Sequence, residues 1–550
     1  MKCMKKETAF WILLGVFSVS FASWLMFHTF SYDAIDSSMR IATKAWSDFG
    51  AHIPLIRSFS LGNNWPPEYP LFPGSPIRYH FLFYFLVGIL EKIGVRIDLA
   101  LNIPSIIGFA GLMIGIAILA QKLFNDKRIT VLSVLFFLFN GSLSWIRFFI
   151  THPPSIHSFQ DITTNTIFPS FAPWGDGDIS AFWNLNIYTN QRHLGAAFSL
   201  ALLFIGILLH MEKIQWHKQK LFLIIEIAIL ALLPYFHQPI LIMIAVFMLC
   251  YFVLFPKLRA SLLLIGTLGI LCILPQMFPL LSGTKTVHFE AGYLMTAPLT
   301  VGNVCWYWAQ NLGLHVFLIP LGWLLASSKV KKITIPLFFL FLIPNLFQFA
   351  VEMAANHKFF NFYLIFGNML SAYALVRTYT YVWKYKLLQF LSRTCALTCG
   401  FFLVFSGIID FFPIANDAKI PLTDMPKNEI ATWIRDNTPP DAVFLNSSYF
   451  FHPASIAGRK IFQGWPYFTW SAGYTENRGA LMKQVYESNS PAVFCPILKQ
   501  KHIHFLTAEN THGDPNVPNI QPSYFSSIAP PVFTTGNYYI FSTDSLCQPL

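Results

Sequence analysis

Long apolar runs separated by short polar stretches dominate the chain from Phe10 to about Phe412. Each run is close to the ~20 residues that an α-helix needs to cross a bilayer. After Ile414 the pattern changes to shorter alternations broken by Gly, Pro and Asn turns. The pattern predicts a polytopic α-helical membrane protein with a transmembrane domain over 1–413 and a small C-terminal α/β domain over 414–550.

About eleven transmembrane helices follow from these runs and from the basic residues between them. Lys and Arg collect in short loops, which the positive-inside rule places in the cytoplasm. The run 79–93 is short and charged at both ends, so it is predicted as an interfacial helix. With that choice every basic loop falls on one side. The predicted spans are 9–28, 99–121, 129–149, 193–211, 221–236, 239–255, 261–281, 310–326, 333–351, 358–376 and 388–412.

The same topology places the long loop 151–192 and the C-terminal domain outside the cytoplasm. The sequence therefore predicts an integral protein of the inner (cytoplasmic) membrane with an extracytoplasmic C-terminal domain. Within that domain, 423–437 is predicted as an amphipathic helix and 442–445 as a strand. Cys495 and Cys547 both lie there, and the sequence leaves open whether they pair.

The composition agrees with a membrane protein. Hydrophobic residues make up 55% of the 550 residues and charged residues 11%, against about a quarter charged in soluble proteins. The net charge of +11 would suggest nucleic acid in a soluble protein. Here the basic residues lie between apolar runs, as topology requires, so membrane lipids and no nucleic acid are the predicted partners.

The first candidate site lies shortly after the first span, in residues 46–52 (WSDFGAH). A carboxylate at the bilayer edge is costly unless a cation, a metal or water balances it. Asp48 and His52 are four residues apart and can share one helix face. The functional interpretation is a general base or a metal ligand. The alternative, a solvated loop aspartate, is favoured by spacing alone.

The second candidate is Arg78-Tyr79-His80, at the head of the predicted interfacial helix. A cation beside lipid headgroups can hold a phosphate. Aromatic and basic residues also collect at interfaces simply as anchors. For Arg78 the two interpretations are level.

The third candidate, Gln191-Arg192-His193, opens the fourth predicted span. A helix N-terminus favours anions, so an Arg and a His there strengthen the case for a phosphate site. An Arg that only extends to the interface is the alternative. Asp176 and Asp178 in the preceding loop have metal-ligand spacing, but Asp-Gly-Asp is also a turn, and the turn is favoured.

Two further groups lie at predicted outer ends of spans. His237 and Gln238 occupy the tight connection between the fifth and sixth spans, and Asn356, His357 and Lys358 open the tenth. A lysine on the outer side gains nothing from topology, so a bound anion is a reasonable hypothesis for Lys358. A lysine that reaches lipid headgroups is the alternative.

An aromatic and charged cluster occurs in the C-terminal domain. It contains Trp465, Tyr467 and Trp470 together with Arg459 and Arg478. Such a cluster can bind a sugar or can be the core of a small domain. The core is favoured for the aromatic residues.

Taken in order, these features resemble the GT-C superfamily of membrane glycosyltransferases, which includes oligosaccharyltransferases, protein O-mannosyltransferases and bacterial aminoarabinose transferases. The shared order is one crossing, an acidic residue in a long outer loop, an interfacial helix, a basic turn at 126–128 and a second outer loop with carboxylates. The segments 46–53, 78–85, 190–193, 356–360 and 458–467 also resemble a group of bacterial and archaeal multi-span proteins regarded as glycosyltransferase-like.

The resemblance implies inverting transfer of a sugar from a polyprenyl-phosphate donor to an acceptor outside the cytoplasm. It assigns Asp48 as base or metal ligand and Asp178 or Asp176 as the assisting second-loop carboxylate, with a divalent cation as the cofactor in question. The chain lacks the paired acidic dipeptide at Asp48 and the WWD-type motif that some members carry, so metal dependence and a peptide acceptor stay open.

The chemistry of the residues is consistent with this implication. Displacing a polyprenyl phosphate builds negative charge on the phosphate and requires a proton to leave the acceptor hydroxyl. We expect Arg78, Arg192 and Lys358 to bind the phosphate and Asp48 to be the base. The rival hypotheses are a transporter or lipid flippase, with Glu226 inside a predicted span, and a non-catalytic partner that binds a lipid-linked sugar.

Overall fold

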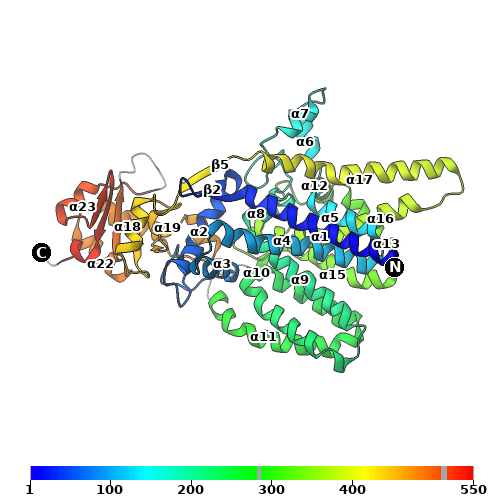
Figure 1. The fold of residues 1–550 in the computed structure, drawn as a ribbon, viewed down its shortest axis with the longest axis horizontal. Helices are drawn as coiled ribbons and strands as arrows, with labels where there is room; N and C mark the ends of the chain where they lie inside the picture. The colour runs from blue at the N-terminus through cyan, green and yellow to red at the C-terminus, as the bar shows by residue number, and fades with distance from the viewer. Residues whose placement is uncertain (1, 282–286, 510–516, 549–550) are drawn as a thin grey trace. The chain divides into compact units, whose positions relative to one another are not determined.

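The computed structural model describes residues 2–281, 287–509 and 517–548, drawn as a ribbon in Figure 1. The chain divides into two compact units. Unit 1 comprises Met1–His28, Pro104–Leu274 and Lys285–Ala418, and unit 2 comprises Thr29–Ile103, Pro275–Thr284 and Lys419–Leu550. The C-terminal segment therefore shares its unit with the first outer loop of the sequence prediction.

Unit 1 contains most of the long apolar helices. Its helices, including α1 and α4 at its borders, are α1 (Lys2–Thr29), α4 (Ile97–Phe124), α5 (Lys127–Leu138), α6 (Ser144–Thr151), α7 (Ser158–Thr163), α8 (Asn186–Asn190), α9 (Arg192–Met211), α10 (Lys220–Leu254), α11 (Arg259–Leu281), α12 (Val301–Leu312), α13 (His315–Leu325), α14 (Ser328–Thr334), α15 (Pro336–Leu346), α16 (His357–Thr380) and α17 (Lys386–Ala415). A two-stranded pair, β3 (His288–Phe289) and β4 (Phe347–Gln348), completes it.

The prediction of eleven transmembrane helices is too high. Among the described residues, seven helices are long and apolar enough to cross a membrane, or eight if the bent pair α12–α13 is one span. These are α1, α4, α9, α10, 256–275 (mostly α11), α16 preceded by a short turn from residue 353, and α17. The chain is therefore a polytopic helical membrane protein. The interfacial prediction for 79–93 corresponds to α3 (Leu82–Lys92), which is too short to be counted among the spans.

Helix α10 explains part of the difference in number. It comprises 35 residues and is interrupted at His237 (φ −168°, ψ 104°). A straight helix of that length would be about 52 Å long. However, Ser261 Oγ donates a hydrogen bond of 2.6 Å to Gln219 Oε1, and the seven residues from Leu254 to Ser261 can span at most about 25 Å. The helix therefore folds back at His237, so its two arms match the predicted spans 221–236 and 239–255.

Two other predicted spans are wrong as continuous helices. Span 129–149 is divided into α5 and α6, and span 333–351 into α14, α15 and β4. The break after α5 lies directly against α17: a Cβ on Gly407 would collide with the backbone of Phe139, and one on Gly141 would lie 2.6 Å from the carbonyl oxygen of Leu403. Ser406 Oγ also donates to the carbonyl of Ser142 at 2.6 Å. Packing against α17 therefore stabilises the interruption.

Another predicted span is bent rather than continuous. Span 310–326 corresponds to the end of α12 and to α13, which meet at 86°. Gly313 (φ +53°) occupies the bend, where a left-handed backbone favours glycine.

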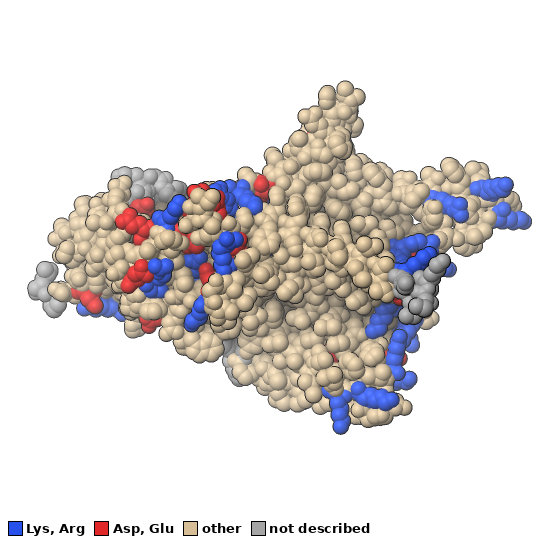
Figure 2. Space-filling view, in the orientation of Figure 1, with Lys and Arg blue, Asp and Glu red and all other residues tan. Residues whose placement is uncertain are grey.

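Basic side chains gather at one end of the unit 1 helices, with few acidic ones among them (Figure 2). Lys329 and Glu212, from two of the predicted cytoplasmic loops, form an ion pair of 3.0 Å. This common end is what the positive-inside rule requires. Which side of the membrane it faces remains a prediction.

Unit 2 is built around two sheets. A three-stranded antiparallel sheet has the order β1 (Phe30–Asp33), β2 (Ser38–Ala42) and β5 (Lys419–Thr423). A five-stranded mixed sheet has the order β7 (Lys460–Ile461), β6 (Val443–Leu445), β8 (Phe505–Glu509), β10 (Tyr538–Ser542) and β9 (Phe533–Thr535). The other helices are α2 (Trp46–Ser60), α18 (Glu429–Asn437), α19 (Pro453–Ile456), α20 (Pro466–Ser471), α21 (Arg478–Glu487), α22 (Pro491–Gln500), α23 (Pro522–Ile528) and α24 (Thr543–Leu546).

The predicted mixed α/β structure of the C-terminal segment is confirmed. Strand β6 lies within the predicted strand 442–445. The predicted helix 423–437 is shorter in the structure, because Asn428 caps α18 by accepting from the N–H of Ala431. One face of the five-stranded sheet packs on α21, α22 and α23 around Met482, Phe494 and Phe525, all fully buried.

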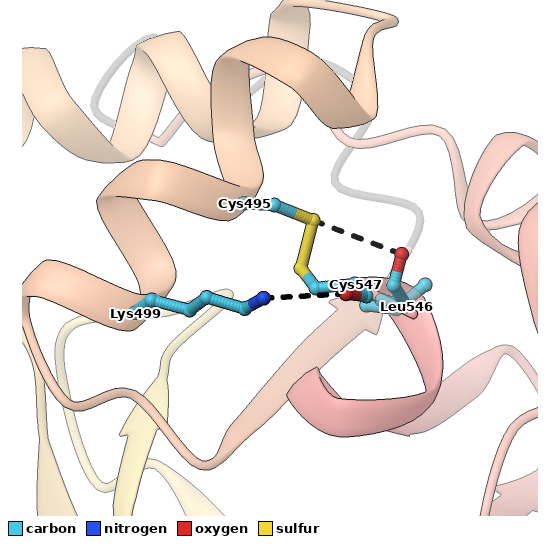
Figure 3. Close-up of a disulfide and its surroundings, with 4 residues drawn as sticks. All are labelled: Cys495, Lys499, Leu546 and Cys547. Carbon is cyan, nitrogen blue, oxygen red and sulfur yellow. Dashed lines mark hydrogen bonds between the residues drawn. A yellow bond between two sulfur atoms is a disulfide. The ribbon is translucent and has the colours of Figure 1, made fainter. Parts of the chain in front are cut away.

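Cys495 on α22 and Cys547 after α24 form a disulfide, with their Cα atoms 5.5 Å apart. This settles the pairing that the sequence left open. Figure 3 shows the bond and the neighbouring Lys499, whose Nζ donates to the carbonyl oxygen of Cys547 at 3.4 Å. The disulfide therefore attaches the end of the chain to α22.

A buried histidine predicts that unit 2 is less stable in acid. His452 is fully buried, and its Nδ1 accepts a hydrogen bond from the N–H of Ala454. Burial lowers the pKa of His452 to about 3, against about 6.5 in an unfolded chain. The contribution of the neutral His452 ring to the free energy of unfolding is thus fully present above pH 6.5 and is lost as the pH falls towards 3. We expect a loss of about 1.4 kcal/mol at pH 5.5.

Hydrogen exchange of the β8 and β10 amides at pH 8 and pH 5.5, corrected for the intrinsic rates, measures this loss in the full chain. His452→Asn is the control, because its amide can still accept from Ala454 but does not titrate in this range. Equal acid sensitivity in both proteins would show that His452 is not the responsible group.

Candidate functional site

Asp48 lies in the first turn of α2, immediately after the 3₁₀ turn Thr43–Ala45. A carboxylate there is favoured by the partial positive charge of the helix N-terminus. The helix forms because Phe49, Ile53 and Ile56 recur at helical spacing and are fully buried. Asp48 itself is half-buried. The structure therefore places Asp48 on a helix, rather than in a solvated loop.

His52 lies one turn after Asp48 on α2, as the spacing predicted, and is buried. Its Nε2 is 2.7 Å from the hydroxyl of Tyr84 on α3, and the two rings stack with centroids 4.5 Å apart. This contact fixes the His52 ring and packs α2 against α3. A catalytic role for His52 remains a prediction.

Arg78 and Tyr79 approach the segment after α20. The Arg78 guanidinium donates to the carbonyl of Gly473 at 2.6 Å and lies 5.0 Å from the centre of the Tyr474 ring. The pKa of Tyr79 is raised above its usual value, first by burial and then by the neighbouring Asp48 and Tyr467. Asp48 and Tyr79 are therefore neighbours within unit 2. The His80 ring is buried, with its centroid 3.6 Å from that of Tyr79.

Gln191 and Arg192 mark the junction between α8 and α9 in unit 1. Arg192 is only 1% exposed, so it does not extend to the surface as a membrane anchor would. Its guanidinium donates to the carbonyl oxygens of Thr189 at 2.8 Å and Met26 at 3.3 Å. These bonds fix the orientation of a buried cation at the start of α9.

The next residue, His193, faces the fold of α10. Its ring stacks on that of His237 with centroids 5.3 Å apart, and both rings are fully buried. Lys358, at the start of α16, is half-exposed and acts electrostatically on His237. Unit 1 thus brings together three predicted residues from α9, α10 and α16, and Gln238 follows directly after the fold of α10.

The two residues before Lys358 have structural partners. Asn356 Nδ2 donates to the carbonyls of Pro344 at 2.9 Å and Phe347 at 2.7 Å. The His357 ring stacks on Phe182 at 3.7 Å. These contacts attach the start of α16 to neighbouring segments. A role of Asn356 and His357 in substrate binding remains a prediction.

Asp176 and Asp178 lie in a turn, as the sequence favoured, with Gly177 at φ +86°. The Asp178 carboxylate forms a partly exposed ion pair of 3.3 Å with Arg147. A carboxylate that already has a cation beside it is a poorer candidate for a metal ligand. Asp48 belongs to unit 2 and Asp178 to unit 1, so a shared divalent cation remains a prediction.

The predicted residues therefore divide between the units. Unit 2 holds Asp48, His52 and 78–80, and unit 1 holds Asp178, 191–193, 237–238 and 356–358. The convergence of Arg192 and Lys358 with Asp48 stays a prediction.

A small polar pocket within unit 1 was not anticipated. It has a volume of about 20 Å³, which suits a single water molecule. Its lining includes Asn140, Asn184, Asn361 and Asn368. Both side-chain polar atoms of Asn140 and Oδ1 of Asn368 are buried without a hydrogen-bond partner in the part of the chain that the structure describes. A water molecule in the pocket would be within reach of these atoms.

Sequence reasoning also missed two features of unit 2. Tyr467 and Trp470, expected in the core, are exposed by 37% and 49%. Arg57 on α2 is buried in a network with Glu91 and Asp424. An arginine among apolar residues was the one available signal for that network. Arg459 and Arg478 are buried and donate to main-chain carbonyls, so they are structural.

No protein-family model and no curated protein matches the chain. Solved structures are similar across nearly its whole length. ArnT from Cupriavidus metallidurans in the apo state has a TM-score of 0.49 at 10% identity, covering 99% of this chain and 100% of that chain. ArnT bound to undecaprenyl phosphate has a TM-score of 0.48 at 10% identity, covering 98% and 99%.

The Archaeoglobus fulgidus oligosaccharyltransferase in the apo form has a TM-score of 0.42 at 12% identity, covering 90% of this chain and 69% of that chain. At these identities and TM-scores, the likeness says nothing about what this chain binds or transfers.

Proposed function

We propose that the chain is a GT-C-type integral membrane glycosyltransferase. It transfers a sugar from a polyprenyl-phosphate donor to an acceptor on the extracytoplasmic face, with inversion. The observation that carries the proposal is the half-buried Asp48 at the start of α2, beside Tyr79. The motif resemblance assigns the base to this same residue.

In this reaction the acceptor oxygen attacks the anomeric carbon while the bond from that carbon to the phosphate oxygen breaks. Asp48 takes the acceptor proton, and polyprenyl phosphate leaves with the negative charge. A positioned carboxylate contributes about 10²–10⁴-fold to such a step. Arg78, Arg192 and Lys358 are the proposed phosphate ligands, because cations stabilise the charge that develops on the leaving group.

We assign the reaction to the extracytoplasmic face on the basis of the predicted topology. Disulfides persist in oxidising compartments, so the bond between Cys495 and Cys547 supports an extracytoplasmic position for the C-terminal segment. An inner (cytoplasmic) membrane location with the basic loops in the cytoplasm agrees with this. A divalent cation at Asp48 and Asp178 stays open.

The test is release of polyprenyl phosphate from polyprenyl-phosphate sugars by the purified chain in nanodiscs, with a panel of hydroxyl acceptors. Transfer of the sugar supports the proposal. Tight binding of the donor with no turnover for any acceptor would instead identify a non-catalytic binding partner.

One observation favours a transporter as the second candidate. Glu226 in α10 is fully buried, and neither carboxylate oxygen has a hydrogen-bond partner among the described residues. Ionisable residues inside spans often belong to ion or proton pathways. If the chain is a glycosyltransferase, we expect Glu226→Gln to transfer sugar within about twofold of the wild type, since the amide is nearly isosteric. Substrate flux across liposomes that is lost in Glu226→Gln, without sugar transfer by the wild type, would establish the transporter.

A further inference from the structure

Helix α20 has an outward aromatic face formed by Tyr467 and Trp470. Their ring centroids are 6.0 Å apart, and both side chains are substantially exposed. We call these two residues the aromatic platform. The residues between them face inward: Thr469 is buried and accepts a hydrogen bond from Gln463 Nε2 at 3.0 Å, and the Phe468 ring lies 5.8 Å from that of Phe450. The platform is therefore presented by a helix that is anchored on its other side.

The anchored side of α20 meets the helix turn that carries Asp48. A Cβ on Gly50 would lie 2.5 Å from the Phe450 ring and 3.7 Å from the Phe468 ring. Only glycine permits that approach. The Trp46 ring also contacts that of Phe451, with centroids 4.4 Å apart, so the start of α2 packs on the segment 450–451 as well. The start of α2 thus packs on Phe450 and Phe451, and Phe450 in turn packs on Phe468 of α20.

Polar groups adjoin the platform. The Tyr79 hydroxyl feels both Asp48 and Tyr467. Arg78 donates to Gly473, two residues after the end of α20. Tyr79 and Arg78 thus lie near α20 within unit 2, and Asp48 acts electrostatically on Tyr79.

This combination matches the two faces of a sugar. A pyranose ring has an apolar C–H face, which packs on amphipathic aromatic rings, and hydroxyl groups, which require hydrogen-bond partners. Lipid tails would satisfy the rings but not the neighbouring Arg78, because a charge beside hydrocarbon is costly. The polar neighbours therefore favour a saccharide over the bilayer as the occupant.

We propose that Tyr467 and Trp470 stack against a sugar ring of the acceptor, next to Asp48, so that the acceptor is a glycan or a glycolipid. That the bound sugar belongs to an acceptor rests on the proposed glycosyltransferase function. The platform itself is a saccharide-binding site with or without catalysis.

The test uses the full chain in detergent on an array of immobilised oligosaccharides. The wild type is expected to bind a subset of glycans, and Trp470→Ala to bind the same glycans about tenfold more weakly, the loss expected for one good aromatic contact. Tyr467→Ala should weaken the same glycans. Trp216→Ala is the matched control, because Trp216 is equally exposed (50%) but lies in unit 1, between α9 and α10.

No saccharide binding by the wild type, or unchanged binding by Trp470→Ala, would overturn the proposal. A nitroxide label at Trp470→Cys in proteoliposomes gives a separate reading. If lipid-soluble oxygen relaxes the nitroxide spin more strongly than a water-soluble nickel chelate does, the platform lies in the bilayer and is a membrane anchor instead. Sugar transfer by Asp48→Asn tests the proposed base, and glycan binding by Trp470→Ala tests the platform, so failure of the base and failure of the platform give different results.

Discussion

Replacing Asp48 by Asn is expected to reduce sugar transfer by about 10²–10⁴-fold, the usual contribution of a general base. The amide has nearly the same shape but cannot take the acceptor proton. We therefore expect kcat to fall while binding of the polyprenyl-phosphate donor and the melting temperature change little. Initial rates of polyprenyl phosphate release, measured with saturating donor, give the effect.

Asp36→Asn is the matched control, because Asp36 is an exposed carboxylate of the same unit that pairs only at the surface, with Arg40 at 3.1 Å. It should transfer sugar at the wild-type rate. If Asp48→Asn retained full activity, Asp48 would not be the base. If both variants were inactive, the loss would reflect general damage to the first outer segment.

Replacing Arg57 by Ala is expected to cost about 3–5 kcal/mol of stability, because it leaves two buried carboxylates without their cation. Arg57 donates to both carboxylate oxygens of Asp424, at 3.1 and 2.7 Å, and to the carbonyl of Ile456 at 3.1 Å. Its Nε lies 2.9 Å from Glu91. All three charged side chains are at most 10% exposed. The melting temperature of the purified protein measures the loss.

The two carboxylates of this network differ. Burial raises the pKa of Glu91 despite the neighbouring Arg57, so its charged form is already penalised. Glu91→Gln should therefore cost clearly less than Arg57→Ala. Arg40→Ala is the surface control and should cost at most about 1 kcal/mol, as exposed ion pairs do. Equal melting temperatures for Arg57→Ala and Arg40→Ala would mean that the buried network adds nothing.

The sequence predicted features that depend on local pattern. The fold of α10 at His237 lies between Pro234 and Pro239, where proline interrupts helical hydrogen bonding. Strand β6 follows from a short apolar run that turn residues bound on either side. In both cases the signal lies within a few residues of the feature.

Features that depend on distant packing were missed. The break between α5 and α6 falls at Asn140-Gly141, a turn signal that the long apolar run around it outweighed in the prediction, and it is stabilised by backbone contact with Leu403 and Gly407, more than 250 residues away. The same holds for the site. Helix α20 has only six residues, too few to show a period, so the inward direction of Phe468 and the outward direction of Trp470 became visible only in three dimensions.

The pairing of β2 with β5 has a consequence for biosynthesis. Arg57 and Asp424, which lie near those strands, are 367 residues apart. At roughly 5–20 residues per second, a ribosome needs on the order of 20–70 s to make the second after the first. Throughout that interval the nascent segment that carries Asp48 has an unpaired strand edge at β2, and Arg57 lacks one of its two carboxylate partners. Synthesis of the long apolar helices thus precedes completion of the sheet beside the segment that carries Asp48, and premature termination before β5 would leave that sheet incomplete.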